Sequence, residues 1–296
     1  EGWVVRVAVR DPEKAHFLQP YGNVGQIVRM PVPIQDEQAV REAVDGADAV
    51  FNAIGLLFEP GGGQTFDEVH VNGPERIARL SAETGVTRLI HVSAIGADKE
   101  SESVYARTKA DGEAAILKQF PQATLLRPSI VIGPEDGFLN FFAQMARISP
   151  ALPLIGGGRT RFQPVYVGDV ADAAMACVEE AKTKSKTYEL GGPKVYTFKQ
   201  LMELLLKEIR RKRLLLPIPF GVAQVQAGVA ELLPKPLLTR DQVTLLKQDN
   251  VVQKGALSFK TLGLEPQAIE AILPTYLVRY RPGGRFAKQH LSSDAR

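Results

Sequence analysis

Residues 88–109 read RLIHVSAIGADKESESVYARTK and decide the fold of this 296-residue chain. The run RLIHV has the length and composition of a buried strand, and Ser93 ends it. Val104–Phe120 then has the apolar spacing of a helix and carries Tyr105 and Lys109 one turn apart. A buried strand followed by a helix is the repeating unit of a parallel α/β sheet.

The same alternation extends on both sides of this segment. Short apolar runs predict strands at Val4–Val9, Gln26–Met30, Ala49–Ile54, Arg88–Val92 and Ala123–Leu126. Helical spacing follows at Asp11–Leu18, Asp36–Val44, Phe66–Thr84 and Val104–Phe120. Strands that alternate with helices form parallel βαβ units with right-handed crossovers. We therefore predict an α/β fold with a doubly wound parallel sheet, the Rossmann fold, whose strands are continuously apolar because both faces are buried.

The pattern changes after Pro128, where glycine, proline and long apolar helices become frequent. Helices are predicted at Leu139–Ile148, Val170–Ala181, Thr197–Arg211, Pro217–Leu233 and Thr239–Lys247, with a short strand at Thr187–Leu190. Asp169 is expected to cap the second of these helices. We predict a nucleotide-binding domain at residues 1–133. Residues 134–296 are predicted to form a smaller, mainly helical α/β lobe that crosses back to the sheet and ends in a tail.

A dinucleotide-binding sheet normally begins with a strand, a glycine-rich turn and a helix whose N-terminus binds the pyrophosphate. Nothing upstream of Val4 supplies this unit, so we expect the chain to lack its first strand, turn and helix. Gly61–Gly63 follow a later strand and lack the spacing of a helix start. They predict a mobile loop rather than a phosphate-binding turn.

Composition excludes several classes of function. A net charge of +3, spread along the chain, is too weak to indicate a nucleic-acid partner. The one basic run, Arg210–Arg213, is either a solvated helix end or a contact for anionic lipid or an acidic partner. Cys177 is the only cysteine, which excludes a disulfide within the chain, and the four histidines lack the spacing of a metal site. No apolar run reaches the roughly 18 residues of a membrane span.

Arg10 ends the first visible strand, at the position that selects the nucleotide in this fold. An acidic residue there would bind the ribose 2′-hydroxyl of NAD, whereas arginine accommodates the 2′-phosphate of NADP. Arg10 therefore predicts NADPH or NADP as the cofactor. The alternative is a surface arginine at the end of a strand.

Ser93, Tyr105 and Lys109 are the candidate catalytic residues. Ser93 lies at the carboxyl edge of the predicted sheet, where ligands bind in open α/β folds. An ammonium group beside a phenol lowers the pKa of the phenol, so that Tyr105 would act as an acid or base near neutral pH. The alternative is a vestigial site that binds nucleotide without turnover.

Further cofactor contacts are expected at the ends of the neighbouring strands. Asn52 and Gly55 would lie beside the adenosine, and the segment Arg127-Pro128-Ser129 would face the nicotinamide. Asn72 either positions a water in the site or makes an ordinary hydrogen bond within its helix. The complete predicted cofactor set is Arg10, Asn52, Ala53, Gly55, Asn72, Val92, Ser93, Tyr105, Lys109, Arg127, Pro128 and Ser129.

These segments resemble the extended and atypical short-chain dehydrogenases/reductases, and within them the nucleotide-binding accessory subunits of respiratory complex I and their bacterial relatives. The segments that carry the resemblance are Val7–Lys14, Leu89–Ala94, Tyr105–Lys109, Leu126–Asp136 and Leu152–Val170. The first four recur across the superfamily, and the last, LPLIGGGRTRFQPVYVGDV, is particular to the complex I group.

The resemblance implies a tightly bound NADPH with a mainly structural role. It also implies contact with other subunits of complex I, NADH:quinone oxidoreductase, near the quinone-entry region and the membrane lipid. The subunit would then be peripheral, on the cytoplasmic side in bacteria or the matrix side in mitochondria. Tyr105 and Lys109 match the tyrosine and lysine that are catalytic in the wider superfamily, and with Ser93 they would be vestigial here. The apolar segment Pro217–Leu233 suits a membrane surface or a partner helix, and equally a core helix.

Two other functions stay open at this point. One is a freestanding NADPH-dependent reductase, dehydratase or epimerase that uses Tyr105, Lys109 and Ser93. The other is a redox-sensing regulator that binds nucleotide without chemistry. A subunit should co-purify with the redox complex and retain its nucleotide, whereas an enzyme should release NADP⁺ and oxidise NADPH with a substrate.

Overall fold

The structure, a computed structural model, describes residues 2–234 and 236–284 of the chain. These residues form two compact units, each built from two stretches of sequence. The first unit comprises Glu1–Arg127 and Ala174–Tyr188, and the second comprises Pro128–Ala173 and Glu189–Arg296. The assignment of nucleotide binding to residues 1–133 stays a prediction.

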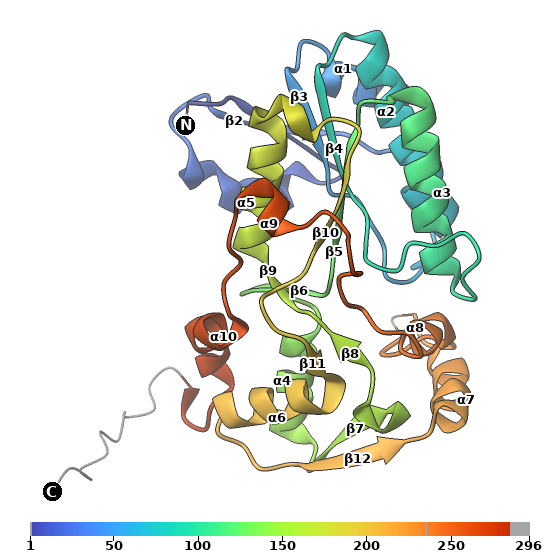
Figure 1. The fold of residues 1–296 in the computed structure, drawn as a ribbon, viewed down its shortest axis with the longest axis vertical. Helices are drawn as coiled ribbons and strands as arrows, with labels where there is room; N and C mark the ends of the chain where they lie inside the picture. Colours follow the sequence, from blue (N-terminus) through green and yellow to red (C-terminus); the bar gives the residue numbers. More distant parts are fainter. Residues whose placement is uncertain (1, 235, 285–296) are drawn as a thin grey trace, which may run out of the picture. The chain divides into compact units, whose positions relative to one another are not determined.

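The first unit contains the predicted βαβ alternation (Figure 1). Its strands are β1 (Val5–Val9), β2 (Ile27–Pro31), β3 (Ala49–Asn52) and β4 (Arg88–Val92), together with the first residues of β5 (Thr124–Pro128) and β10 (Thr187–Leu190), whose last residues fall in the second unit. Its helices are η1 (Pro12–Tyr21), α1 (Glu37–Val44), η2 (Asp67–Asn72), α2 (Gly73–Glu83), α3 (Val104–Gln119) and η4 (Ala181–Thr183). Strands β3, β4 and β5 pair in parallel within a four-stranded sheet of order β10-β5-β4-β3. The predicted α/β class with a parallel sheet is thus confirmed.

The helices of the first unit begin where the sequence provides a cap. The carboxylate of Asp36 accepts a hydrogen bond from the Ala39 amide at the start of α1, and the hydroxyl of Ser103 accepts one from Ala106 at the start of α3. Helix α2 packs on both α1 and α3, and the three helices bury an apolar core with Leu89 of β4. Because side chains alternate along a strand, His91 and Ser93 face the same side as Leu89.

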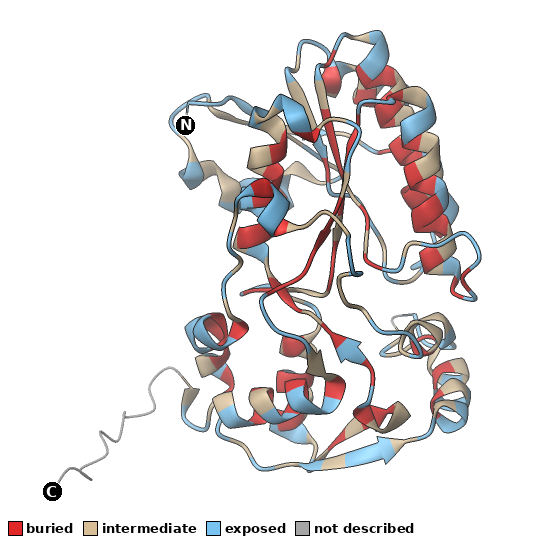
Figure 2. Ribbon diagram, in the orientation of Figure 1, coloured by how far each residue is buried: buried red, intermediate tan, exposed pale blue. Residues whose placement is uncertain are grey.

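Burial differs between the strands, and one expectation is wrong. Strands β4 and β5 are mostly buried, as predicted, but most residues of β1 are exposed (Figure 2). The reason is that β1 pairs only with β2, in a separate two-stranded parallel sheet. None of the described residues forms a strand that pairs with the other edge of β1.

The second unit combines short strand pairs with helices. Its strands are β6 (Val131–Ile132), β7 (Ala151–Ile155), β8 (Arg161–Phe162), β9 (Val165–Tyr166), β11 (Tyr196–Thr197) and β12 (Leu214–Ile218). Its helices are α4 (Leu139–Ile148), η3 (Gly156–Gly158), α6 (Phe198–Glu208), α7 (Phe220–Ala230), α8 (Arg240–Leu245), α9 (Phe259–Leu262), α10 (Ile269–Leu277) and η5 (Val278–Tyr280). The rings of Phe138, Phe142, Phe162 and Phe198 meet at the centre of its core. No helix among residues 2–234 and 236–284 has the length and hydropathy of a membrane span.

Two sequence-based boundaries are corrected here. Helix α5 runs from Val167 to Glu179, so Asp169 lies in its first turn and is not its cap. The Asp169 carboxylate accepts hydrogen bonds from the backbone and side-chain amides of Gln267 instead. Leu214–Ile218 is a strand paired in parallel with β7, whereas the sequence predicted helix from Pro217. The apolar run lacks a helical periodicity, so its pattern fits a strand as well as a helix. Its pairing partner, β7, is remote in sequence, so local sequence could not decide between the two.

Candidate functional site

The candidate site lies in the first unit, where β4 ends. The backbone amide of Ser93 donates to the carbonyl of Leu126 at 2.7 Å, which continues the β4–β5 pairing by one residue. The Ser93 side chain is buried, yet its hydroxyl makes no hydrogen bond with any described residue. Buried hydroxyl groups are almost always paired in native proteins. The Ser93 hydroxyl is therefore suited to bind a ligand at the carboxyl edge of the sheet, the edge used by ligands in open α/β folds.

Lys109 extends from α3 to the same strand end. Its ammonium Nζ donates to the backbone carbonyl of Val92 at 3.0 Å, and the side chain is only 4% exposed. Burial lowers the pKa of Lys109 to about 8, although the nearby carboxylate of Glu113 favours the charged form. A buried ammonium with one carbonyl partner retains two N–H groups that can bind an acceptor.

Tyr105 lies one turn before Lys109, but its environment differs from the prediction. Its ring packs edge-on against Phe66 and His70, at centroid distances of 6.1 and 5.3 Å. Burial raises the pKa of Tyr105 to about 12. The direction is opposite to the lowering expected from Lys109, because removal of the phenol from water is what shifts this pKa.

Two buried histidines complete the site, and the sequence reasoning missed both of them. The ring of His70 accepts a hydrogen bond from the Leu56 amide at Nε2 and lies 3.0 Å from Thr108 Oγ1 at Nδ1. Nδ1 of His91 lies 3.0 Å from the side-chain amide nitrogen of Asn52. The position of these two histidines next to apolar residues, in segments predicted to be buried, is the sequence signal that could have indicated them.

The Asn52 amide also fixes the proton of His91. Its Oδ1 accepts from the backbone amide of Ile54 at 3.1 Å, so its nitrogen donates to His91 Nδ1 and leaves the proton of His91 on Nε2. This buried Nε2–H has no partner among the described residues. Burial and the charge of Lys109 hold the pKa of His91 well below its ordinary value, so the ring is neutral. It adds a second unpaired donor to that of Ser93.

The structure brings together only part of the predicted cofactor set. Asn52, Gly55, Val92, Ser93, Tyr105 and Lys109 lie around the ends of β3 and β4, and Ala53 lies in the exposed loop after β3. Arg127 instead forms a two-pronged ion pair with Glu113 of α3, from Nε to Oε1 and from Nη2 to Oε2. This pairing orients its guanidinium toward α3.

Three other predicted residues lie in other segments of the chain. Asn72 is exposed, and its amide donates to the Glu68 carboxylate, which is the ordinary helix hydrogen bond of the two alternatives. Pro128, the last residue of β5, and Ser129 belong to the second unit, where the Ser129 hydroxyl donates to Asn250. The hydroxyl of Ser129 therefore has a hydrogen-bond partner within the protein, unlike that of Ser93.

Arg10 follows β1 and is exposed, without a partner among the described residues. The next residue, Asp11, caps η1 through a hydrogen bond from the Glu13 amide and pairs with Lys14 at 3.3 Å. Both interactions lower the pKa of the Asp11 carboxyl. The acidic side chain at this position is thus engaged with protein, while the guanidinium of Arg10 is available.

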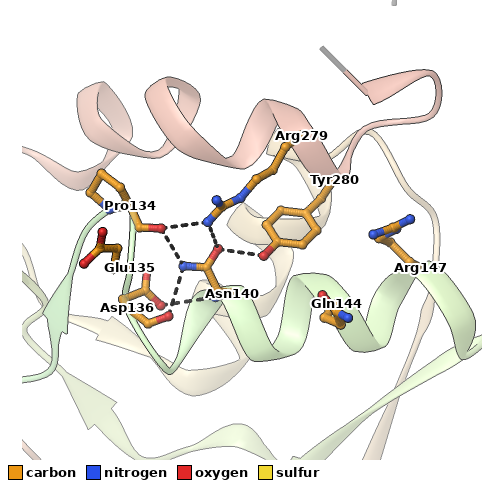
Figure 3. Close-up of a pocket in the computed structure, with 8 residues that line it drawn as sticks. All are labelled: Pro134, Glu135, Asp136, Asn140, Gln144, Arg147, Arg279 and Tyr280. Atoms are coloured by element: carbon orange, nitrogen blue, oxygen red, sulfur yellow. Dashed lines mark hydrogen bonds between the residues drawn. The ribbon is translucent and has the colours of Figure 1, made fainter. Parts of the chain in front are cut away.

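A cavity of about 480 Å³ lies in the second unit, and none of the predicted cofactor residues lines it (Figure 3). It is lined by Pro134, Glu135, Asp136, Asn140, Gln144, Arg147, Arg279 and Tyr280. The Asn140 side chain accepts hydrogen bonds from Arg279 and Tyr280 and donates to the Pro134 carbonyl. Arg279 is thus held by protein. The wall of this cavity is a structural network.

Comparison with known proteins places this geometry in context. Residues 1–130 match the NAD(P)H-binding family model. The chain is 36% identical to the mitochondrial NADH dehydrogenase [ubiquinone] 1 alpha subcomplex subunit 9 of Arabidopsis thaliana, over 96% of this chain and 73% of that protein. It is 33% identical to the mitochondrial NADH-ubiquinone oxidoreductase 40 kDa subunit of Neurospora crassa, over 95% of this chain and 74% of that protein. The solved dTDP-glucose 4,6-dehydratase DesIV of Streptomyces venezuelae, with NAD and TYD bound, has the same fold at a TM-score of 0.71 and 18% identity, over 93% of this chain and 86% of that one.

Proposed function

We propose that this chain, which belongs to the family of NADH dehydrogenase [ubiquinone] 1 alpha subcomplex subunit 9, is an NADP(H)-holding accessory subunit of respiratory complex I. Its role would be mainly structural, in assembly near the quinone and membrane region. The observation that carries nucleotide binding is the group of buried donors at the end of β4. The Ser93 hydroxyl and the His91 Nε2–H have no described partner, beside an ammonium that retains N–H groups. Such donors suit the hydroxyl and amide oxygens of a dinucleotide.

Arg10 and Asp11 support NADP(H) over NAD(H). A carboxylate that binds the adenosine ribose must accept from its hydroxyl groups, but that of Asp11 is engaged by Glu13 and Lys14. The exposed guanidinium of Arg10 suits a 2′-phosphate, which guanidinium groups bind with two parallel hydrogen bonds. In this proposal the bound nucleotide would either stabilise the fold as a ligand or supply a hydride. Arg10 would bind its adenosine end.

The environment of Tyr105 favours a protein that binds the nucleotide without catalysing a reaction. A phenol whose pKa is about 12 is a poor proton donor or acceptor near pH 7, and catalytic groups work best when their pKa lies near the working pH. Lys109 is also turned to the Val92 carbonyl. These features favour the subunit over a freestanding reductase, dehydratase or epimerase.

The surface of the second unit supports a position against lipid. Residues 214–230 contain no charged side chain, and β12 is largely exposed (Figure 2). In α7, Ala223 and Ala227 are buried, while Val222, Val225 and Val229 share an exposed face. An apolar helix face beside basic residues is typical of proteins that lie on an anionic membrane surface.

The basic run Arg210–Arg213, which precedes β12, contains side chains with two different roles. Arg211 donates to the carbonyl of Tyr280 and Arg213 to that of Ala146, so these two side chains stabilise the unit itself. Arg210 and Lys212 are exposed and suit anionic headgroups. The proposed contact is with the membrane face that borders the matrix in mitochondria or the cytoplasm in bacteria.

The test starts from the native protein in the membranes of its source. Detergent-solubilised complex I is purified, washed and denatured, and the released nucleotide is quantified by chromatography. The proposal expects this chain in the complex and about one NADPH or NADP⁺ released for each copy. A soluble chain that separates from the complex, or one that oxidises NADPH in a Tyr105-dependent manner, would refute it.

A further inference from the structure

His70 links two elements of the site that are separate in sequence. Its Nε2 accepts a hydrogen bond from the backbone amide of Leu56, in the loop after β3, at 3.0 Å. Its Nδ1 lies 3.0 Å from the hydroxyl of Thr108, on α3. The imidazole is 1% exposed and stacks on Phe66 at 5.2 Å. The loop and the helix are thereby joined through one buried ring.

These contacts define a single protonation state. Because Nε2 accepts from Leu56, it carries no proton, and Nδ1–H donates to the Thr108 oxygen. The Thr108 hydroxyl in turn donates to the carbonyls of Val104 and Tyr105. A chain of hydrogen bonds therefore runs from the loop after β3 to the first turn of α3. A protonated His70 could not accept from Leu56 and would break this chain.

The ring stays neutral in its surroundings. Burial and the nearby ammonium of Lys109 lower the pKa of His70 to about 4. The other titratable groups against it are Tyr105 of α3 and His91 of β4. Of these, Lys109 alone carries a positive charge near neutral pH, and that charge opposes protonation of His70.

The local backbone is built to allow this close approach. His70 lies in η2, a π-helical turn, a conformation that is rare and occurs often at functional sites. A Cβ added at Gly112 of α3 would lie 1.8 Å from the His70 carbonyl oxygen, so only glycine lets the two backbones meet. A Cβ added at Gly55 would lie 3.5 Å from Lys109 Nζ and 3.9 Å from His70 Nε2. The loop, the ammonium and the imidazole therefore meet at one point.

We infer that His70 is a positioning residue of the nucleotide site, which holds the backbone of residues 55–56 against the Lys109 ammonium without contacting the nucleotide itself. The inference rests on the proposed nucleotide function. The carboxyl ends of parallel strands bind the cofactor in this fold, so the loop after β3 must be ordered before it can line the site. A ligand that has to order a loop on binding loses affinity, and a loop that is already held avoids this loss.

Three variants of the native full-length protein test this role, with NADPH affinity measured by fluorescence titration. His70→Phe retains ring packing but removes both hydrogen bonds. His70→Gln restores an acceptor for the Leu56 amide. Thr108→Val removes the partner of Nδ1. We expect His70→Phe to weaken NADPH binding about tenfold, the equivalent of one hydrogen bond, and His70→Gln to recover most of this loss.

Hydrogen exchange of the Leu56 amide provides the readout that a general loss of stability would not reproduce. It should accelerate in His70→Phe more than the amides of β4 do. If a folded His70→Phe binds NADPH within twofold of the unmodified protein, the inference is wrong. If His70→Phe does not fold, Thr108→Val decides by the same criterion, with severalfold weaker binding expected. Failure of the unmodified protein to bind NADPH or NADH would overturn the proposed function instead.

Discussion

The ammonium of Lys109 donates a hydrogen bond to the carbonyl of Val92, the last residue of β4, at 3.0 Å. A lysine on α3 thus ends at the carboxyl edge of the sheet, with its charge almost entirely removed from water. Such a charge is costly in the absence of an anionic or polar ligand and becomes useful when a ligand binds. Stability and nucleotide affinity should therefore oppose one another at this residue.

Lys109→Met should stabilise the nucleotide-free protein and weaken nucleotide binding. A shift of the pKa from 10.5 to about 8 corresponds to roughly 3 kcal/mol, and loss of the hydrogen bond to Val92 removes about 1 kcal/mol of this benefit. We expect the free energy of unfolding at pH 7 to rise by about 2 kcal/mol. Urea unfolding and NADPH titration measure the two effects. A variant that is less stable and binds NADPH unchanged would contradict the prediction.

The same group predicts a pH dependence. Between pH 8 and pH 10.5 the unfolded chain keeps the Lys109 proton that the folded chain has lost, so the stability contributed by this group rises with pH. Below pH 8 the lysine is charged in both states and its cost is fully present. The stability difference between Lys109→Met and the unmodified protein should therefore shrink across this window. Urea unfolding at pH 7, 9 and 10.5 would reveal it, and a constant difference would count against the buried charge.

Arg10→Ala should separate the two nucleotides. Loss of a guanidinium–phosphate contact costs about 1.5–3 kcal/mol, so NADPH affinity should fall roughly 10- to 100-fold. NADH, which has no 2′-phosphate, should bind the variant and the unmodified protein equally. Arg29→Ala is the matched control, because Arg29 already donates to the Pro12 carbonyl. Equal losses for NADPH and NADH would refute the role of Arg10 in selection.

The sequence predicted the part of this fold that depends on local pattern. The alternation of apolar runs and helices placed β4 and α3 within a residue of their observed bounds, because burial on both faces leaves a clear signal. The resemblance to complex I accessory subunits is confirmed by relatives at 33–36% identity. The strand at Leu214–Ile218 was missed because an apolar run without periodicity fits either a helix or a strand.

The site was predicted less completely, because the partners of a side chain depend on the tertiary structure and cannot be read from local sequence. Ser93 and Lys109 lie together at the end of β4, as expected, because strand ends and helix spacing are visible in sequence. Arg127 could not be recognised as the partner of Glu113, and the sequence left two alternatives open for Asn72, of which the hydrogen bond within the helix is the one observed. His70 and His91 lay within predicted elements, but only their contacts reveal what they do.

Gly112→Ala should disrupt the packing of α3 on η2. The added Cβ would lie 1.8 Å from the His70 carbonyl oxygen, a backbone atom that cannot move aside without displacing the turn. Overpacking of this kind costs about 1–3 kcal/mol or more, although alanine favours helix by about 1 kcal/mol. Gly221→Ala in α7 is the control, since its Cβ would meet nothing within 4 Å, and it should gain about 1 kcal/mol. Thermal unfolding compares them, and equal melting temperatures would contradict the contact.

Val225→Glu should weaken binding of the protein to membranes. Val225 is 70% exposed on the apolar face of α7, next to Val222 and Val229. Burial of a valine in lipid contributes about 1.5–3 kcal/mol, and a carboxylate would oppose both insertion and anionic headgroups, so partitioning should fall at least ~10-fold. Flotation with phosphatidylcholine vesicles, with and without phosphatidylglycerol, measures it. Gln144→Glu, at an exposed position of α4, makes the same charge change and should have little effect. Equal flotation of both variants would contradict the contact of α7 with lipid.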